Sequence, residues 1–161
     1  MPLSIAELDR MPAAAAAELL TACCGSKRWV TEMLSRRPFG SRETLTTSGE
    51  TIWQQLTPAD WVEAFRQHPR IGATDARGLA AEEQSGMDAA SVATRAALID
   101  LNREYEQRFG YIYIVCATGR SAEELLAAAR SRLLNPPGIE LATAALEQQK
   151  ITRLRLERLV Q

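Results

Sequence analysis

One short run of this chain favours an extended backbone, and it has no clear counterpart elsewhere. Residues 111–116 read Tyr-Ile-Tyr-Ile-Val-Cys, and aromatic and β-branched side chains of this kind are enriched in strands. A buried strand needs a neighbour, because its backbone amides and carbonyls must be hydrogen-bonded. Since the sequence has no second clear strand, a sheet is not expected. The run is predicted to be a buried extended segment in an otherwise helical protein.

The remainder of the chain carries helix signals. Ser4 with Glu7, and Ser121 with Glu124, have the spacing of a capping box. Helices are expected over residues 11–24, 27–37, 57–68, 89–108, 121–134 and 139–160, and residues 43–56 are expected to form a weak connector with some helical character and with Ile52, Trp53 and Leu56 buried. A length of 161 residues suits one domain. The sequence therefore predicts an all-α fold: a single-domain helical bundle over residues 1–161 with one extended buried segment.

The charge balance argues against polyanionic partners. Lysine and arginine together number 19, against 20 aspartates and glutamates, so no overall basic footprint supports nucleic-acid binding. The first residues lack the pattern of a secretory signal, and no apolar run approaches the roughly 20 residues of a membrane span. We therefore expect a cytoplasmic protein with no nucleic-acid partner and no membrane segment.

The cysteines and the histidine do not suggest a metal or disulfide framework. Cys23, Cys24 and Cys116 are too few and too poorly placed for such a framework, and a reducing compartment is the simpler interpretation. The chain has one histidine and no C-x-x-C pair, so no metal site is expected.

His68 is a candidate proton donor. It is the only histidine, and Pro69 after it ends the preceding helix. A helix C-terminus favours the imidazolium form, and histidine has the unperturbed pKa nearest to neutral pH. Arg70 can hold a carboxylate through two parallel hydrogen bonds. The plainer alternatives are a histidine that only caps a helix and an arginine in a surface ion pair.

A second polar group, Glu82-Glu83-Gln84, follows a loop with two glycines. Taken alone, it is typical of a solvated acidic turn. The ordered combination is more specific: His68-Pro69-Arg70-Ile71-Gly72, Glu83-Gln84 with Gly86, Leu101-Asn102 with Tyr105, Phe109-Gly110-Tyr111, residues 114–121, Lys150-Ile151 and Arg155-Leu156. This set resembles the OHCU decarboxylase family (2-oxo-4-hydroxy-4-carboxy-5-ureidoimidazoline decarboxylases) over nearly the whole chain.

The resemblance implies an all-α enzyme, commonly a homodimer, that uses no metal and no organic cofactor. The implied reaction converts the ureidoimidazoline carboxylate to (S)-allantoin and CO2 in urate catabolism. Loss of CO2 leaves an electron pair on a ring carbon, and the adjacent C=N bond of the substrate can accept it. A separate electron sink such as pyridoxal is therefore not needed.

The resemblance also implies roles for individual residues. His68 would be the catalytic proton donor, and Glu83 would hold the substrate and orient the histidine. Contacts with the substrate are expected for Pro69, Arg70, Gln84, Tyr113, Ile114, Val115, Cys116, Ala117 and Arg120. The extended run would contribute through its main-chain groups, while its side chains pack in the core.

One position departs from the family pattern, since Ala80 stands three residues before Glu83, where a serine is usual. The change removes one expected hydroxyl contact with the substrate.

Two other classes of function stay open. A helical adaptor would use His68 only as a cap, and a helical nucleic-acid regulator would need a basic stripe that the sequence does not supply.

Overall fold

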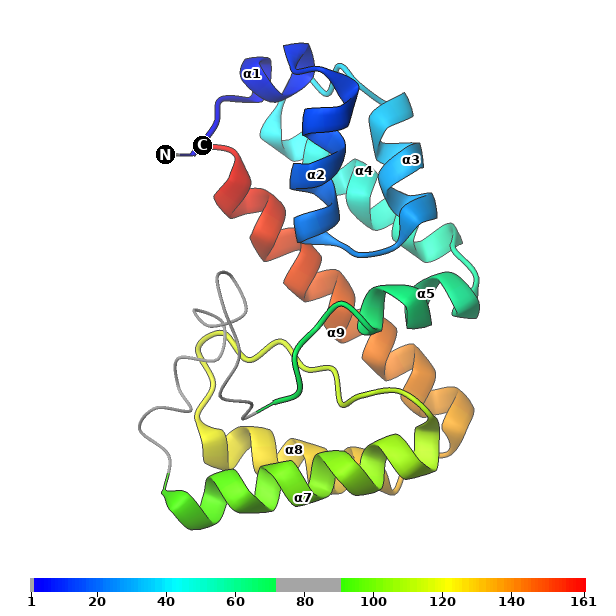
Figure 1. The fold of residues 1–161 in the computed structure, drawn as a ribbon, viewed down its shortest axis with the longest axis vertical. Helices are drawn as coiled ribbons and strands as arrows, with labels where there is room; N and C mark the ends of the chain where they lie inside the picture. Colours follow the sequence, from blue (N-terminus) through cyan, green and yellow to red (C-terminus); the bar gives the residue numbers. More distant parts are fainter. Residues whose placement is uncertain (1, 72–90) are drawn as a thin grey trace. The chain divides into compact units, whose positions relative to one another are not determined.

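The computed structural model describes residues 2–71 and 91–161 (Figure 1). Within these ranges the chain forms eight helices and no β-strand, and one isolated bridge pairs Leu3 with Val160. The prediction of an all-α fold is confirmed. The chain divides into two compact units: unit 1 runs up to Gln67 and resumes at Gln149, and unit 2 is His68–Gln148. None of the described helices has the length and apolar character required to cross a membrane.

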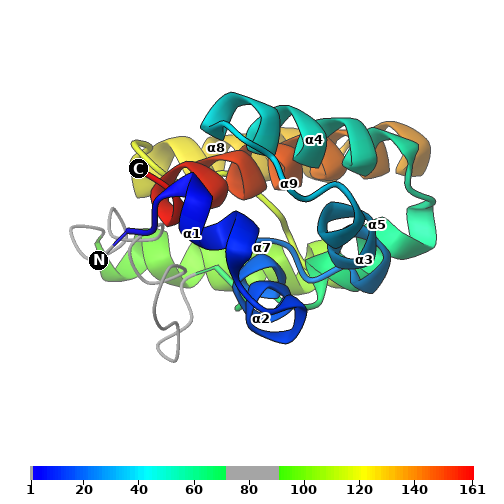
Figure 2. The same cartoon turned by 90° about the horizontal axis from the view of Figure 1, so that it is seen from above.

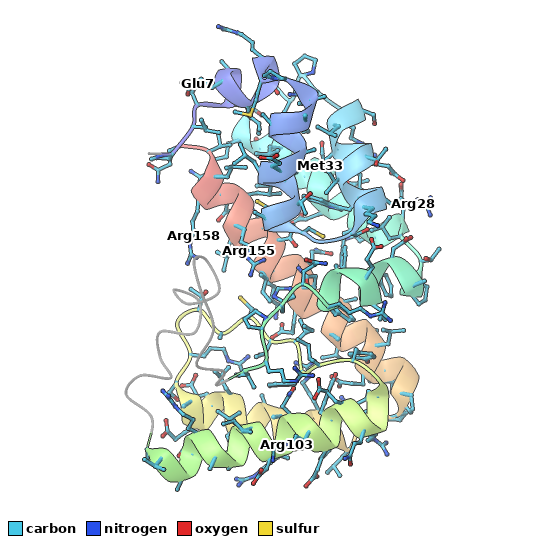
Figure 3. All side chains as sticks on the ribbon, in the orientation of Figure 1. Glu7, Arg28, Met33, Arg103, Arg155 and Arg158 are labelled. Atoms are coloured by element: carbon cyan, nitrogen blue, oxygen red, sulfur yellow. The ribbon has the colours of Figure 1, made fainter. Side chains whose placement is uncertain are left out.

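Unit 1 is built from helices of which several begin at a serine or threonine N-cap. Its helices are α1 (Ile5–Arg10), α2 (Ala13–Cys23), α3 (Lys27–Ser35), α4 (Arg42–Gln55), α5 (Pro58–Phe65) and the last part of α9 (Pro137–Leu159). The capping box of Ser4 and Glu7 is present, and Thr57 forms another with Asp60. Met33 points from α3 into the core of this unit (Figure 3), where it is fully buried.

The connector predicted over residues 43–56 is instead a regular helix, α4, whose N-cap is Ser41. Tertiary packing explains the difference. Trp29 Nε1 donates to the carbonyl of Gly49 at 3.0 Å, and a Cβ at Gly49 would lie only 3.0 Å from Leu156 Cδ1. Figure 2 shows α4 alongside the C-terminal part of α9, where Arg153 pairs with Glu50 at 2.7 Å. Ile52, Trp53 and Leu56 are buried as predicted.

Unit 2 is built on two helices that point in the same direction, α7 (Val92–Phe109) and α8 (Ala122–Leu133) (Figure 1). Helix α7 ends at Gly110, whose φ of 82° places it in the left-handed region that suits glycine. Its outer face is exposed, and Arg103 points away from the unit (Figure 3). Val92, in the first turn of α7, is 88% exposed.

The extended run is the return path between these parallel helices. An α-helix rises 1.5 Å per residue, so the 18 residues of α7 span about 27 Å. Residues 112–117 cover about 20 Å of the return when extended, and the turn at residues 118–119 leads into α8. Residues 112–117 lie in neither helix nor strand, which confirms the predicted extended segment. Tyr113 and Ile114 are buried, as expected for their side chains.

Candidate active site

His68 lies in a bend at the start of unit 2, and its ring is held by a glutamine. Its Nε2 lies 2.5 Å from Oε1 of Gln148 on α9. The sequence placed His68 at the C-terminal end of a helix, and this was wrong: α5 ends at Phe65, with Arg66 as its C-cap. The effect of a helix dipole fades beyond the last turn, and Gln148 is a partner that orients this imidazole.

Arg70 is in an ion pair on the surface of unit 2. Its Nε donates to both carboxylate oxygens of Glu106 on α7, at 3.0 and 3.2 Å, and its side chain is 66% exposed. Arg70 therefore forms a surface ion pair, which the sequence allowed as the alternative to binding a substrate carboxylate. A substrate carboxylate at Arg70 would have to share the guanidinium with Glu106.

The extended run keeps its shape through side chains that bind its backbone. Asn102 Oδ1 accepts a hydrogen bond from the amide of Tyr113 at 2.9 Å, and Arg132 Nη1 donates to the carbonyl of Ile114 at 2.6 Å. Within the described residues, the amides of Ile114 and Val115 have no hydrogen-bond partner. These two groups are therefore main-chain donors that a bound molecule can use.

Arg132 is itself held by a buried carboxylate. Its Nε donates to Oε1 of Glu140 at 2.7 Å, and the same oxygen accepts from Tyr105 Oη at 2.5 Å. Asn135 Nδ2 donates to the second oxygen of Glu140 at 3.0 Å. Glu140 is fully buried. Burial, reinforced by the hydrogen bond to Glu140, raises the pKa of Tyr105, so this phenol stays protonated as the donor.

The far end of the run is held from α9 as well. Glu147 Oε1 accepts from the amide of Cys116 at 3.4 Å and lies 3.5 Å from Nη1 of Arg120. Glu147 and Gln148 are consecutive on α9, so one turn of this helix binds both the histidine and the end of the extended run. The structure thereby brings together His68, Cys116 and Arg120, three of the predicted site residues.

Glu83 and Gln84, together with Ala80, lie outside the described residues. The same is true of the loop glycines Gly72 and Gly78 and of Gly86. The roles expected for Glu83 and Gln84 stay predictions. Pro69 follows His68 in the described part of the chain.

Two residues of this site were missed by the sequence reasoning, namely Gln148 and Glu147. A signal for Gln148 was present: it stands four residues after Ala144 and three before Ile151, at the spacing of one helix face. Ala144 and Ile151 are buried, and a polar side chain between them must find a partner inside. Among the described residues, no three His, Cys, Asp or Glu side chains gather in a way that would hold a metal ion.

Comparisons with known proteins bear on what this site does. A family model described as OHCU decarboxylase matches residues 9–157. A uric acid degradation bifunctional protein of Arabidopsis thaliana is 37% identical over 85% of this chain, which spans 45% of that protein. A 2-oxo-4-hydroxy-4-carboxy-5-ureidoimidazoline decarboxylase of Amia calva is 31% identical over 79% of this chain and 77% of its own length.

A solved structure gives the same picture of the fold. The crystal structure of an OHCU decarboxylase in the presence of (S)-allantoin is 35% identical to this chain, with a TM-score of 0.80. The match covers 89% of this chain and 96% of that one.

Proposed function

This chain belongs to the OHCU decarboxylase family, and we propose that it removes CO2 from 2-oxo-4-hydroxy-4-carboxy-5-ureidoimidazoline to give (S)-allantoin in urate degradation. One geometric observation supports the proposal. Consecutive residues of α9, Glu147 and Gln148, hold the end of the extended run and His68. A proton donor and main-chain hydrogen-bond donors are thus attached to one rigid element.

The reaction needs little from the protein beyond position and one proton. The bond between the ring carbon and its carboxylate breaks, CO2 leaves, and the electron pair moves into the adjacent C=N bond of the substrate. The C=N electrons pass to the nitrogen, which leaves an enol at the carbon that lost the carboxylate. A proton from the imidazolium of His68 then adds to the neighbouring ring carbon, which bears the ureido group, while the enol hydroxyl passes its proton to the nitrogen and becomes the carbonyl of allantoin. Because the donor is fixed on one side, one enantiomer of the product results, and the fixed orientation itself lowers the barrier.

The other predicted residues receive roles in the same scheme. Glu83 would hold the substrate and orient His68, with Gln84 and Pro69 in contact with the substrate. The free amides of Ile114 and Val115 would hydrogen-bond its ring or ureido oxygens, and such preorganised donors stabilise developing negative charge. Arg70 and Arg120 would meet the substrate carboxylate while paired with Glu106 and Glu147.

The test of this function is an assay on freshly prepared substrate with and without the purified protein. CO2 release and the optical activity of the product must both be recorded, because this substrate also decays spontaneously. We expect faster release and a single enantiomer with the protein present. Equal rates and a racemic product in both samples would refute the activity and favour the adaptor alternative.

We expect the activity to be independent of metal ions. The one histidine has its Nε2 beside the amide oxygen of Gln148, and no metal-binding cluster forms among the described residues. Exhaustive chelation should therefore leave turnover unchanged. If activity disappears on chelation and returns when a divalent ion is added, this expectation is wrong.

We also expect a homodimer, a proposal that rests on the family resemblance. Sedimentation at the concentration of the assay should give twice the mass of one chain. A monomer that is fully active at that concentration would contradict the proposal.

The domain count and the location complete the proposal. A single decarboxylase domain over residues 1–161 is supported by a family match that runs through both units. A cytoplasmic location is supported by Cys23, Cys24 and Cys116, which form no disulfide with one another. Burial raises the pKa of Cys24 to about 12, so this thiol stays protonated and unreactive.

A further inference from the structure

One peptide of the extended run is held at its carbonyl end by a buried charged group. Arg132 Nη1 donates to the carbonyl oxygen of Ile114 at 2.6 Å. This carbonyl belongs to the same peptide as the amide of Val115, and that peptide is trans and planar. The N–H of Val115 therefore points in the direction opposite to Arg132. It has no hydrogen-bond partner among the described residues.

We propose that Arg132 is a positioning residue for the reaction, which acts through the peptide between Ile114 and Val115 to aim and strengthen the Val115 amide as a donor to the substrate. The inference rests on the proposed function, because it requires the substrate to bind at the extended run. Arg132 itself does not touch the substrate in this scheme. Its guanidinium acts at the carbonyl end of the peptide, and the N–H at the other end makes the contact.

A positive charge at the carbonyl oxygen strengthens the donor at the other end of the same peptide. Hydrogen bonds with an ionised donor are roughly twice as strong as neutral ones, and hydrogen bonds in series polarise one another. The guanidinium of Arg132 draws electron density toward the oxygen of Ile114, which leaves the N–H of Val115 more positive. Negative charge develops on the substrate as CO2 leaves, and a preorganised N–H stabilises such charge.

The guanidinium is held in place by the protein alone. Arg132 Nε donates to Oε1 of Glu140 at 2.7 Å, and the guanidinium carbon lies 4.7 Å from the centre of the Tyr113 ring. Arg132 is 8% exposed and Glu140 is fully buried. A charge fixed in this way needs no rearrangement during the reaction, which is the condition under which electrostatic stabilisation is most effective.

The contacts of the run single out the Val115 amide. The amide of Tyr113 is already engaged, because it donates to Oδ1 of Asn102 at 2.9 Å. The amides of Ile114 and Val115 are the next two along the chain. Only the Val115 amide shares its peptide with the carbonyl that Arg132 binds, so the effect of the charge falls on this donor.

The first test is NMR spectroscopy of the unmodified, isotope-labelled protein titrated with (S)-allantoin, the proposed product. We expect the amide proton of Val115 to move downfield. The carbonyl carbon of Ile114 and Nη1 of Arg132 should shift with the same dependence on ligand concentration, while the guanidinium of the exposed Arg130 should not. A shift at Val115 without one at Arg132 would refute the role of Arg132. No shift at Val115 would overturn the whole inference.

A matched pair of variants tests the effect on the reaction. Arg132→Lys keeps a positive charge beside Glu140, but one ammonium cannot reproduce the planar fork that binds Glu140 and Ile114 together. We expect kcat to fall by about tenfold, less than the loss on removing a donor outright, and the allantoin-induced shift of Val115 to become smaller. Arg130→Lys makes the same change at an exposed position of α8 and should alter neither quantity.

The folded fraction of each variant is measured by circular dichroism, and kcat is expressed per folded molecule, because a loss of stability alone lowers only that fraction. If kcat and the Val115 shift both fall in Arg132→Lys, the inference and the proposed function hold. If the unmodified protein accelerates CO2 release and Arg132→Lys changes neither quantity, the function stands and the role of Arg132 is refuted. If the Val115 shift weakens but the unmodified protein does not accelerate CO2 release, the proposed function fails and Arg132 only positions a binding amide.

Discussion

His68→Asn should lower turnover by about 10²- to 10⁴-fold, the range typical of lost acid–base catalysis, while the chain stays folded. Asparagine is polar and smaller than histidine, so it avoids overpacking beside Gln148, but it cannot deliver a proton at neutral pH. Initial rates of CO2 release and the enantiomeric composition of allantoin are the measurements. Circular dichroism must first show that the variant has the helix content of the unmodified protein.

Arg36→Ala is the control for this experiment. Arg36 is the exposed C-cap of α3 in unit 1, and its removal should leave turnover nearly unchanged. A folded His68→Asn protein that still formed one enantiomer at close to the original rate would show that His68 is not the proton donor.

A second substitution tests whether Glu83 acts with His68. Glu83→Gln should reduce turnover by a comparable factor. In the double variant the two losses should be far from additive in free energy, because residues that act as one unit cannot be removed twice. Additive losses would mean that the two side chains act independently.

Arg132→Met should lower the free energy of unfolding by about 3–5 kcal/mol, the cost of leaving one partner of a buried ion pair alone. The substitution leaves the fully buried carboxylate of Glu140 without its guanidinium and frees the carbonyl of Ile114. Arg130→Met, two residues earlier on α8 and exposed, is the matched control and should change the free energy by less than about 0.5 kcal/mol.

Tyrosine and tryptophan signals can show which of the two units loses stability in Arg132→Met. All three tryptophans lie in unit 1 and all three tyrosines in unit 2. In denaturant titrations, tyrosine absorbance should therefore report the loss in unit 2 directly, and tryptophan fluorescence should report unit 1. Adding Glu140→Leu to Arg132→Met should recover part of the stability, since the unpaired charge is then gone. A double variant less stable than Arg132→Met would contradict this explanation.

The elements that local chemistry controls were predictable from the sequence. The capping box at Ser4, the cap at Ser121 and the extended run all follow from a few neighbouring residues. Helix α4 was underestimated because Thr46, Ser48 and Gly49 have low helix propensity. Its stability comes instead from packing against side chains far away in the sequence, which propensity cannot register.

The candidate site was also predictable only in part, because its contacts join residues that are far apart in the sequence. His68 was identified because its sequence neighbours are distinctive, but its partner Gln148 is 80 positions away and sits in an ordinary helical pattern. Asn102 and Tyr105 belonged to the motif that resembles the family, yet the motif did not tell what they do. The structure shows them fixing the extended run and the carboxylate of Glu140.

The spacing along α9 restricts how this chain can vary in length. Glu140 and Glu147 are separated by about two helical turns, so both face the interior of unit 2, where they are buried. Inserting or deleting one residue between them would rotate Glu147 and Gln148 by about 100° about the helix axis and withdraw both from their partners. We therefore expect insertions and deletions to be tolerated in the connections between helices. Within this stretch of α9 they should abolish activity, even where the helix still forms.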